Sequence, residues 1–219
     1  MGQADPIFII IVSIMPVVMG LVIWFAWKEG KKTRTKLRAL ADEMGLGFIA
    51  PPPLFGIFHS SPRLFGQVQG REVEIYQYTT GSGKNSRTWS ALKLGHVGTS
   101  RLAITLSGQG LGSKIRSVFG AEEIQVEDRH FNNRWFIETN DPDFLTVALF
   151  GKACAAIDAS QSAVGKPKGT FELKDGDVFY REQGALSSDA RIARIRQALP
   201  AAQALLDIAD VHASQSPNA

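Results

Sequence analysis

The alternation of hydrophobic and polar residues divides the chain into three parts. From Ile7 to Trp27 the sequence is almost continuously apolar. From about residue 63 to residue 139, apolar residues recur at every second position, which is typical of strands with one buried face. Helical spacing returns in two later segments, 142–158 and 188–212. This order predicts an N-terminal helix followed by an α+β domain.

The N-terminal apolar run predicts a transmembrane helix. Its 21 residues carry no charge, and a helix of that length spans about 31 Å, which matches the hydrocarbon core of a bilayer. Pro16 and Gly20 interrupt the run, but membrane helices tolerate both. A buried core helix is one alternative, although such helices are usually shorter. A cleaved signal peptide is the other, and it is disfavoured because residues 1–6 contain no basic residue.

The flanks of this run predict its orientation. Between positions 28 and 38 lie six basic residues and one acidic residue, whereas residues 1–6 contain only Asp5. The positive-inside rule then places the N-terminus outside and everything after Trp27 in the cytoplasm, at the plasma (inner) membrane. We expect two tryptophans and the six basic side chains to lie among anionic lipid headgroups. They are Trp24, Trp27, Lys28, Lys31, Lys32, Arg34, Lys36 and Arg38.

The segments with a period of two predict an antiparallel sheet of seven or eight strands, because short connections join them. The predicted strands cover residues 64–69, 72–80, 88–94, 101–106, 124–126, 135–137 and the two arms of 170–180. Gly70-Arg71 is the predicted turn of the first hairpin. Asp175-Gly176 is the strongest turn signal in the chain, and a two-residue turn there pairs Leu173 with Val178.

Two helices are predicted to pack against this sheet. Asn140 or Asp141 caps the first, over residues 142–158, and Val147 and Cys154 belong to its apolar stripe. The second covers residues 188–212, and Pro200 should kink or split it. The predicted fold is therefore α+β, with a transmembrane helix before an antiparallel sheet domain and its two helices.

These elements give a domain organisation in six parts. We expect an extracytoplasmic tail (1–6), a transmembrane helix (7–27), a basic juxtamembrane helix with a Pro-rich linker (28–56), an α+β domain (57–186), a C-terminal helix (187–212) and a flexible tail (213–219). Pro51 to Pro53 make the end of the linker a plausible hinge between anchor and domain.

The charge balance narrows the choice of partners. The chain has 24 basic and 21 acidic residues, a formal net charge of +3. Without the six basic residues of segment 28–38, and without Glu29 and Asp5, 18 basic and 19 acidic residues remain. The basic character therefore belongs to the membrane flank, and the nearly neutral domain lacks the basic surface that a nucleic-acid partner requires.

The segment 79–87 is the main candidate for ligand binding. Its Gly-Ser-Gly-Lys sequence resembles the end of a phosphate-binding loop, but Tyr78 stands where that motif needs its first glycine and Asn85 where it needs Ser or Thr. A hairpin loop explains the same composition. If the segment does bind an anion or small molecule, the side chains would be Lys84 and Arg87, with Tyr76, Tyr78 and Trp89 nearby.

Other signals for chemistry are weak. Glu127, Asp128 and His130 are close in sequence, but no further metal ligand completes a recognisable metal-binding spacing, and polar turns are common between strands. Cys154 is the single cysteine, and a small buried side chain is its expected role. We therefore expect no metal, no cofactor and no catalytic residues, and the sequence favours a protein that is not an enzyme.

Several short motifs resemble those of a group of bacterial single-pass membrane-anchored proteins of unknown function. The shared pattern is Gly-Arg-x-Val before a Tyr-rich strand, a Gly-Ser-Gly-Lys turn, Phe-Asn-x-x-Trp and an Asp-Pro-x-Phe helix start. Here it is carried by Gly70, Arg71, Val73, Tyr76, Gly81, Gly83, Lys84, Phe131, Asn132, Trp135, Asp141, Pro142 and Phe144. The resemblance implies a single domain with strands and helices, and it implies no activity.

Two functions remain from these observations. The first is a membrane-tethered interaction or scaffold module that faces the cytoplasm and recruits a protein partner. The second is an anion-binding or small-molecule-binding protein, or an enzyme, that uses the 79–87 loop. A deep pocket at that loop would favour the second function, and a flat exposed loop would count against it.

Overall fold

The computed structural model describes residues 6–50, 61–95, 100–109, 122–161 and 165–215. Within these residues, nine strands form one antiparallel sheet in the order β1-β2-β3-β4-β9-β8-β5-β7-β6. The strands are β1 (Gly47–Ile49), β2 (Arg63–Val68), β3 (Arg71–Thr80), β4 (Arg87–Leu94), β5 (Ile104–Gly108), β6 (Glu122–Ile124), β7 (Trp135–Thr139), β8 (Gly169–Lys174) and β9 (Asp177–Gln183). The helices are α1 (Pro6–Met44), α2 (Arg129–Arg134), α3 (Pro142–Ala148), α4 (Lys152–Ala159) and α5 (Asp189–Gln215), with a short 3-10 turn, η1 (Gly83–Asn85). The predicted α+β class is confirmed.

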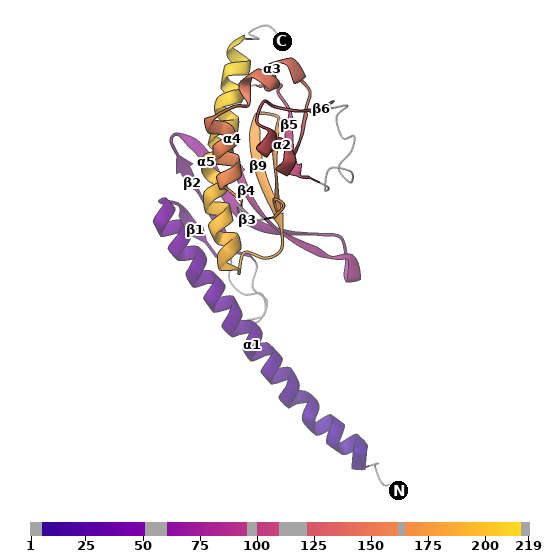
Figure 1. Ribbon diagram of the computed structural model, residues 1–219. Helices are drawn as coiled ribbons and strands as arrows, with labels where there is room; N and C mark the ends of the chain where they lie inside the picture. The colour runs from indigo at the N-terminus through magenta and orange to yellow at the C-terminus, as the bar shows by residue number, and fades with distance from the viewer. Residues whose placement is uncertain (1–5, 51–60, 96–99, 110–121, 162–164, 216–219) are drawn as a thin grey trace.

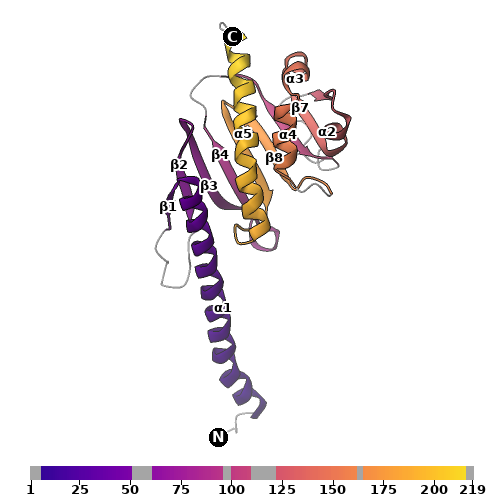
Figure 2. The ribbon, with the colours of Figure 1, turned by 60° about the vertical axis from the view of Figure 1, so that its left-hand side comes forward.

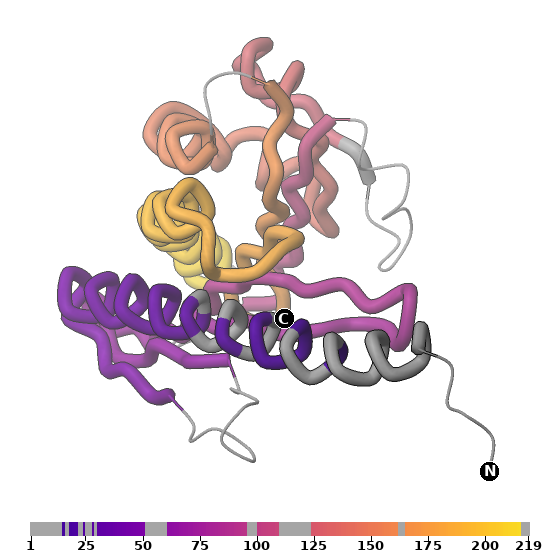
Figure 3. Tube along the Cα trace, turned by 90° about the horizontal axis from the view of Figure 1, so that it is seen from below, coloured from indigo at the N-terminus to yellow at the C-terminus, as the bar shows by residue number. Residues whose placement is uncertain are grey.

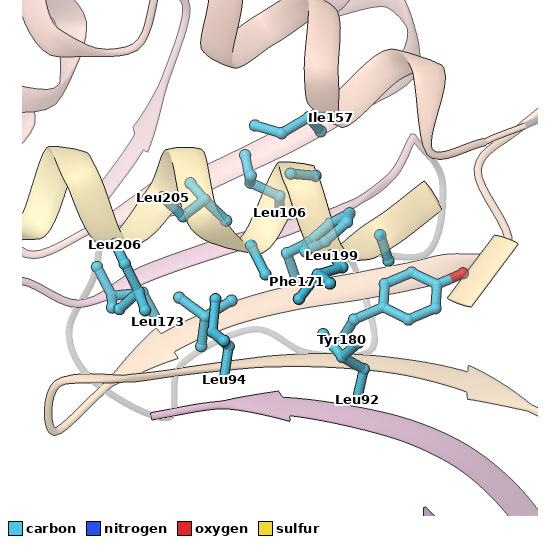
Figure 4. Packing of buried hydrophobic residues seen from close by; sticks show 14 of the residues in the cluster. Leu92, Leu94, Leu106, Ile157, Phe171, Leu173, Tyr180, Leu199, Leu205 and Leu206 are labelled. Carbon is cyan, nitrogen blue, oxygen red and sulfur yellow. The ribbon is translucent and has the colours of Figure 1, made fainter. Parts of the chain in front are cut away.

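The hydrophobic core lies between one face of the sheet and a layer of helices. The C-terminal part of α1, α5 and α4 lie on the same side of the sheet (Figures 1, 2 and 3). Alternate residues of the central strands, among them Leu92, Leu94 and Tyr180, point into this layer and are 0% exposed. Leu199 and Leu205 of α5 pack over them (Figure 4). Burial of these side chains is the main stabilising contribution to the fold.

Turn chemistry fixes the register of the two tightest hairpins. The β8–β9 hairpin turns at Asp175 and Gly176, both with positive φ, and pairs Leu173 with Val178 as predicted. The β2–β3 hairpin turns at Gln69 and Gly70, with φ of 54° and 77°, so the predicted turn at Gly70-Arg71 was one residue too late.

The helical predictions need three corrections. The segment 142–158 forms two helices, because Gly151, with a φ of 49°, interrupts the helical backbone, and Val147 is 75% exposed instead of buried. The polar link after Val126 contains the short helix α2, whose N-cap is Asp128. Pro200 lies inside α5 and does not split it.

The N-terminal helix is continuous and ends inside the domain. Leu37, Leu40 and Ala41 of α1 are at most 3% exposed, and ion pairs join Lys36 to Asp189 at 2.6 Å and Glu43 to Arg196 at 2.8 Å. Strand β1 follows directly and pairs with β2. The end of α1 and β1 thus belong to the domain, which begins well before residue 57, the start predicted from the juxtamembrane helix and Pro-rich linker at 28–56. The Pro-rich segment at 51–56 follows β1 and lies outside the described residues.

The predicted membrane span is only partly described. Most side chains between residues 7 and 27 lie outside the described set. In the part of the chain that is described, no helix has an apolar stretch long enough to cross a bilayer.

Candidate interaction surface

The sheet face opposite α5 brings together side chains from five strands. Since Ile75, Leu92 and Tyr180 point into the core, their neighbours along each strand point to the other side. We call this second side the outer face. Its side chains include Phe65, Glu74, Tyr76, Tyr78, Trp89, Lys93, Glu172, Phe179 and Arg181.

Aromatic rings and charged groups alternate across the outer face. The rings of Tyr76 and Tyr78 are 5.8 Å apart. The Arg63 guanidinium lies 5.7 Å from the Tyr76 ring, and the Lys93 ammonium lies 5.6 Å from the Phe179 ring. Such cation–π pairs hold the basic groups against the rings and leave an amphipathic surface.

Each of these cations also has an acidic partner. Arg63 pairs with Glu74 at 3.0 Å and Lys93 pairs with Asp177 at 2.7 Å. The hydrogen bond to Asp177 raises the pKa of Lys93. Partial burial, with a smaller contribution from Glu74, raises the pKa of Tyr76. The surface is therefore close to neutral, and Tyr76 presents a neutral phenol to a ligand.

Two recesses hollow this face. One, of about 430 Å³, is lined by Tyr76, Tyr78, Glu172, Phe179 and Arg181. Glu172 and Arg181 form an ion pair beside the rings. The other, of about 740 Å³, lies between Phe65, Lys93 and Asp177 and their neighbours. Both recesses are open to one side and suit a protruding side chain or loop of a partner better than an enclosed small molecule.

Two of the five residues that line the first recess were predicted from the sequence. Tyr76 and Tyr78 were predicted to lie near a binding site, and the structure places them in the recess together with residues of β8 and β9. Glu172, Phe179 and Arg181 were missed, although they alternate with the core residues of the predicted β8–β9 hairpin. Their outward direction could have been read from the sequence, but the pairing of β9 with β4 could not.

The predicted anion-binding residues lie away from both recesses. Lys84 and Arg87 are exposed at the tip of the β3–β4 hairpin, and strand β4 follows them where a phosphate-binding loop would begin a helix. Gly81, with φ of 77°, allows the tight tip because a Cβ there would meet the Asn85 carbonyl oxygen at 2.5 Å. Trp89 is held against the hairpin by a 2.9 Å hydrogen bond from Nε1 to Thr80 Oγ1.

The remaining polar candidates have structural roles. Asp128 accepts hydrogen bonds from the backbone N–H groups of His130 and Phe131 and so caps α2. No cluster of three potential metal ligands occurs among the residues described. Cys154 is 3% exposed, and burial raises the pKa of its thiol to about 11. The thiol is protonated at neutral pH and packs as a small hydrophobic side chain.

The basic segment 28–38 divides into two parts. Lys28, Lys31 and Lys32 are exposed, and the Lys28 ammonium lies 5.0 Å from the Trp24 ring. Nearer the domain, Lys36 is paired with Asp189, and the Arg38 guanidinium lies 6.0 Å from the Phe48 ring. The side chain of Trp27 is outside the described residues, and Arg34 is half-buried.

Comparison with known proteins identifies the fold and no family. No family model matches the sequence, and no curated protein matches it either. Among solved structures, the mycobacterial trehalose monomycolate transport factor A, TtfA, is similar, with a TM-score of 0.53 and 10% sequence identity. The similarity covers 80% of this chain and 93% of that chain. At this identity the two proteins share a fold, and the likeness concerns the fold alone.

Proposed function

We propose that this protein is a membrane-tethered interaction module whose α+β domain recruits a protein partner in the cytoplasm. The observation that carries the proposal is the continuity of α1. One helix connects the uncharged segment 7–27 with Leu37, Leu40 and Ala41, which are built into the core of the domain. The segment 7–27 is the transmembrane anchor, and the N-terminus lies outside.

This continuity gives the tether a specific mechanical property. A flexible linker would let the domain sample many orientations, whereas a helix docked by buried leucines and two ion pairs holds the domain in one orientation relative to the anchor. The outer face is then presented at a fixed height above the membrane. A partner that is itself bound to the membrane would meet this face without an additional ordering cost.

The basic residues next to the anchor and a similar solved structure are compatible with this role. Lys28, Lys31 and Lys32 supply cations for anionic headgroups next to the anchor. The mycobacterial protein with this fold is named for the transport of trehalose monomycolate, which agrees with a place for this chain at a lipid membrane. We also propose that the chain belongs with the bacterial single-pass proteins that share its Gly-Arg-x-Val and Asp-Pro-x-Phe motifs.

The anchor is tested by placing charges in it. Val18 and Leu21 are 51% and 52% exposed on α1, so arginine at both positions leaves the domain core intact. Each arginine near the centre of a span opposes insertion by about 2.5–3.5 kcal/mol. We expect V18R/L21R to move from the carbonate-resistant membrane fraction to the soluble fraction. The control V147R/V211R places the same charges on exposed positions of the domain and should stay in the membrane.

The partner surface is tested by photo-crosslinking in intact membranes. A photoreactive phenylalanine analogue at Tyr76, in the recess of the outer face, should give a discrete crosslinked product with a cellular protein. The same analogue at Val147, which is exposed on α3, should not. The double variant Phe179→Ala/Arg181→Ala should remove the product. Equal crosslinking from both positions, or none from Tyr76 while the chain is in the membrane, would refute the outer face as the partner surface.

A further inference from the structure

The tip of the β3–β4 hairpin combines three features that neither the core nor the recesses of the outer face explain. The tip residues from Thr79 to Arg87 are all exposed. Between Ile75 and Leu94 the chain carries three basic residues and no acidic one. Lys93 is paired with Asp177, whereas Lys84 and Arg87 have no acidic partner within the described part of the chain. The tip is thus a local cationic projection on a nearly neutral domain.

The hairpin points toward the side of the domain from which the anchor leaves. Figures 1 and 2 show the tip, with η1, at the lower end of the sheet, and α1 extends beyond that same end. Because α1 is fixed to the core through Leu37 and Leu40, the hairpin and the N-terminal part of α1 keep this common direction. A membrane that contains the anchor therefore lies on the side toward which the hairpin projects.

The residue types at the tip match the headgroup region of a bilayer. Trp89 and Tyr78 form a cross-strand pair just behind the two cations, and amphipathic aromatic rings favour the membrane interface. Gly81, Ser82 and Gly83 are small and allow close approach to a flat surface. Lys84 and Arg87 complement the phosphate groups of anionic lipids, as do the exposed lysines of the segment 28–38.

We propose that the β3–β4 hairpin tip is a second membrane contact, which binds anionic phospholipid headgroups through Lys84 and Arg87. This inference rests on the proposed membrane anchor. With the anchor alone, the domain could rotate about the axis of α1. A second membrane contact at some distance from that axis prevents this rotation. It therefore fixes the direction, parallel to the membrane, in which the outer face points.

The test uses the full chain in lipid nanodiscs, with Cys154→Ala and a fluorescent probe attached at Ser82→Cys. The discs contain either phosphatidylcholine alone or phosphatidylcholine with phosphatidylglycerol. We expect the probe to be protected from a water-soluble quencher only in discs with phosphatidylglycerol, and we expect high salt to remove the protection. The variant K84E/R87E should abolish it. The matched control R129E/K152E reverses two exposed charges at α2 and α4 and should retain it.

The possible outcomes separate the two proposals. If the chain does not enter the discs, the proposed anchor is refuted. If the chain enters but the probe is equally accessible in both lipids, the anchor stands and the hairpin contact is overturned. As a further condition, inorganic phosphate is added to discs of phosphatidylcholine alone. If phosphate protects the probe from the quencher there, the tip binds free anions, and lipid headgroups are overturned as the ligand.

Discussion

Replacing Glu182 by glutamine is expected to lower the free energy of unfolding by about 3 kcal/mol, because it leaves two partly buried cations without their buried counter-charge. Glu182 is 2% exposed on β9. Arg194 donates to both of its carboxylate oxygens, at 2.9 and 2.5 Å, and Arg191 donates to one of them at 3.3 Å. The hydrogen bond to Glu182 raises the pKa of Arg194 above its usual value. Urea unfolding of the full chain in detergent, followed by tryptophan fluorescence, measures the change.

A matched surface pair provides the control for Glu182. Glu74 pairs with Arg63 at 3.0 Å, but these side chains are 34% and 62% exposed. Exposed ion pairs contribute about 0–1 kcal/mol, so Glu74→Gln should change stability by no more than that. If both variants lost the same free energy of unfolding, burial would not be the reason that the ion pairs of Glu182 stabilise the fold.

Gly169→Ala is expected to destabilise the fold by about 2–3 kcal/mol through overpacking. Gly169 begins β8 and lies under the ring of Tyr180, so an added methyl group would overlap that ring. The ring has little room to move, since Tyr180 is 0% exposed and its hydroxyl is held by Gln161 and Glu182 at 3.1 Å each. The midpoint of thermal unfolding, measured by circular dichroism, should fall accordingly.

Two control variants distinguish the effect of steric overlap with Tyr180 from the effect of replacing a glycine by alanine in general. Gly30→Ala in α1 adds a methyl group that meets nothing within 4 Å, and it should leave the domain's unfolding unchanged. Tyr180→Leu removes the ring, so Gly169→Ala added to that background should cost much less than it does in the natural sequence. Additive losses would contradict the proposed overlap.

Local chemistry made much of the fold predictable. The Asp175-Gly176 turn and its register follow from residues that adopt positive φ and from the alternation around them. The helix start at Pro142 follows from the cap at Asp141, whose side chain accepts a hydrogen bond from the Phe144 N–H. The outward direction of Tyr76 and Tyr78 follows from the period of the strand. Each of these depends on interactions within a few residues.

The parts that escaped prediction depend on contacts between distant segments. Residues 142–158 have one helical pattern, but the structure divides them into α3 and α4 at Gly151 and buries both Leu145 and Cys154 in the core. The end of α1 was predicted as a juxtamembrane helix outside the domain, but its residues Leu37, Leu40 and Ala41 are buried in the domain core. The recess of the outer face needed β9 beside β4, a pairing between strands more than 80 positions apart in sequence.

By itself, the sequence determined the class of the fold, most of the strands and the charge asymmetry on either side of the segment 7–27, because periodicity, turn residues and charge are local properties. Only the tertiary structure decided that α1 is docked into the domain, that Tyr76 shares a recess with Phe179 and Arg181, and that Lys84 and Arg87 project away from it. Those facts come from long-range strand pairing and from burial of one face of each element, and both depend on every segment of the domain at once.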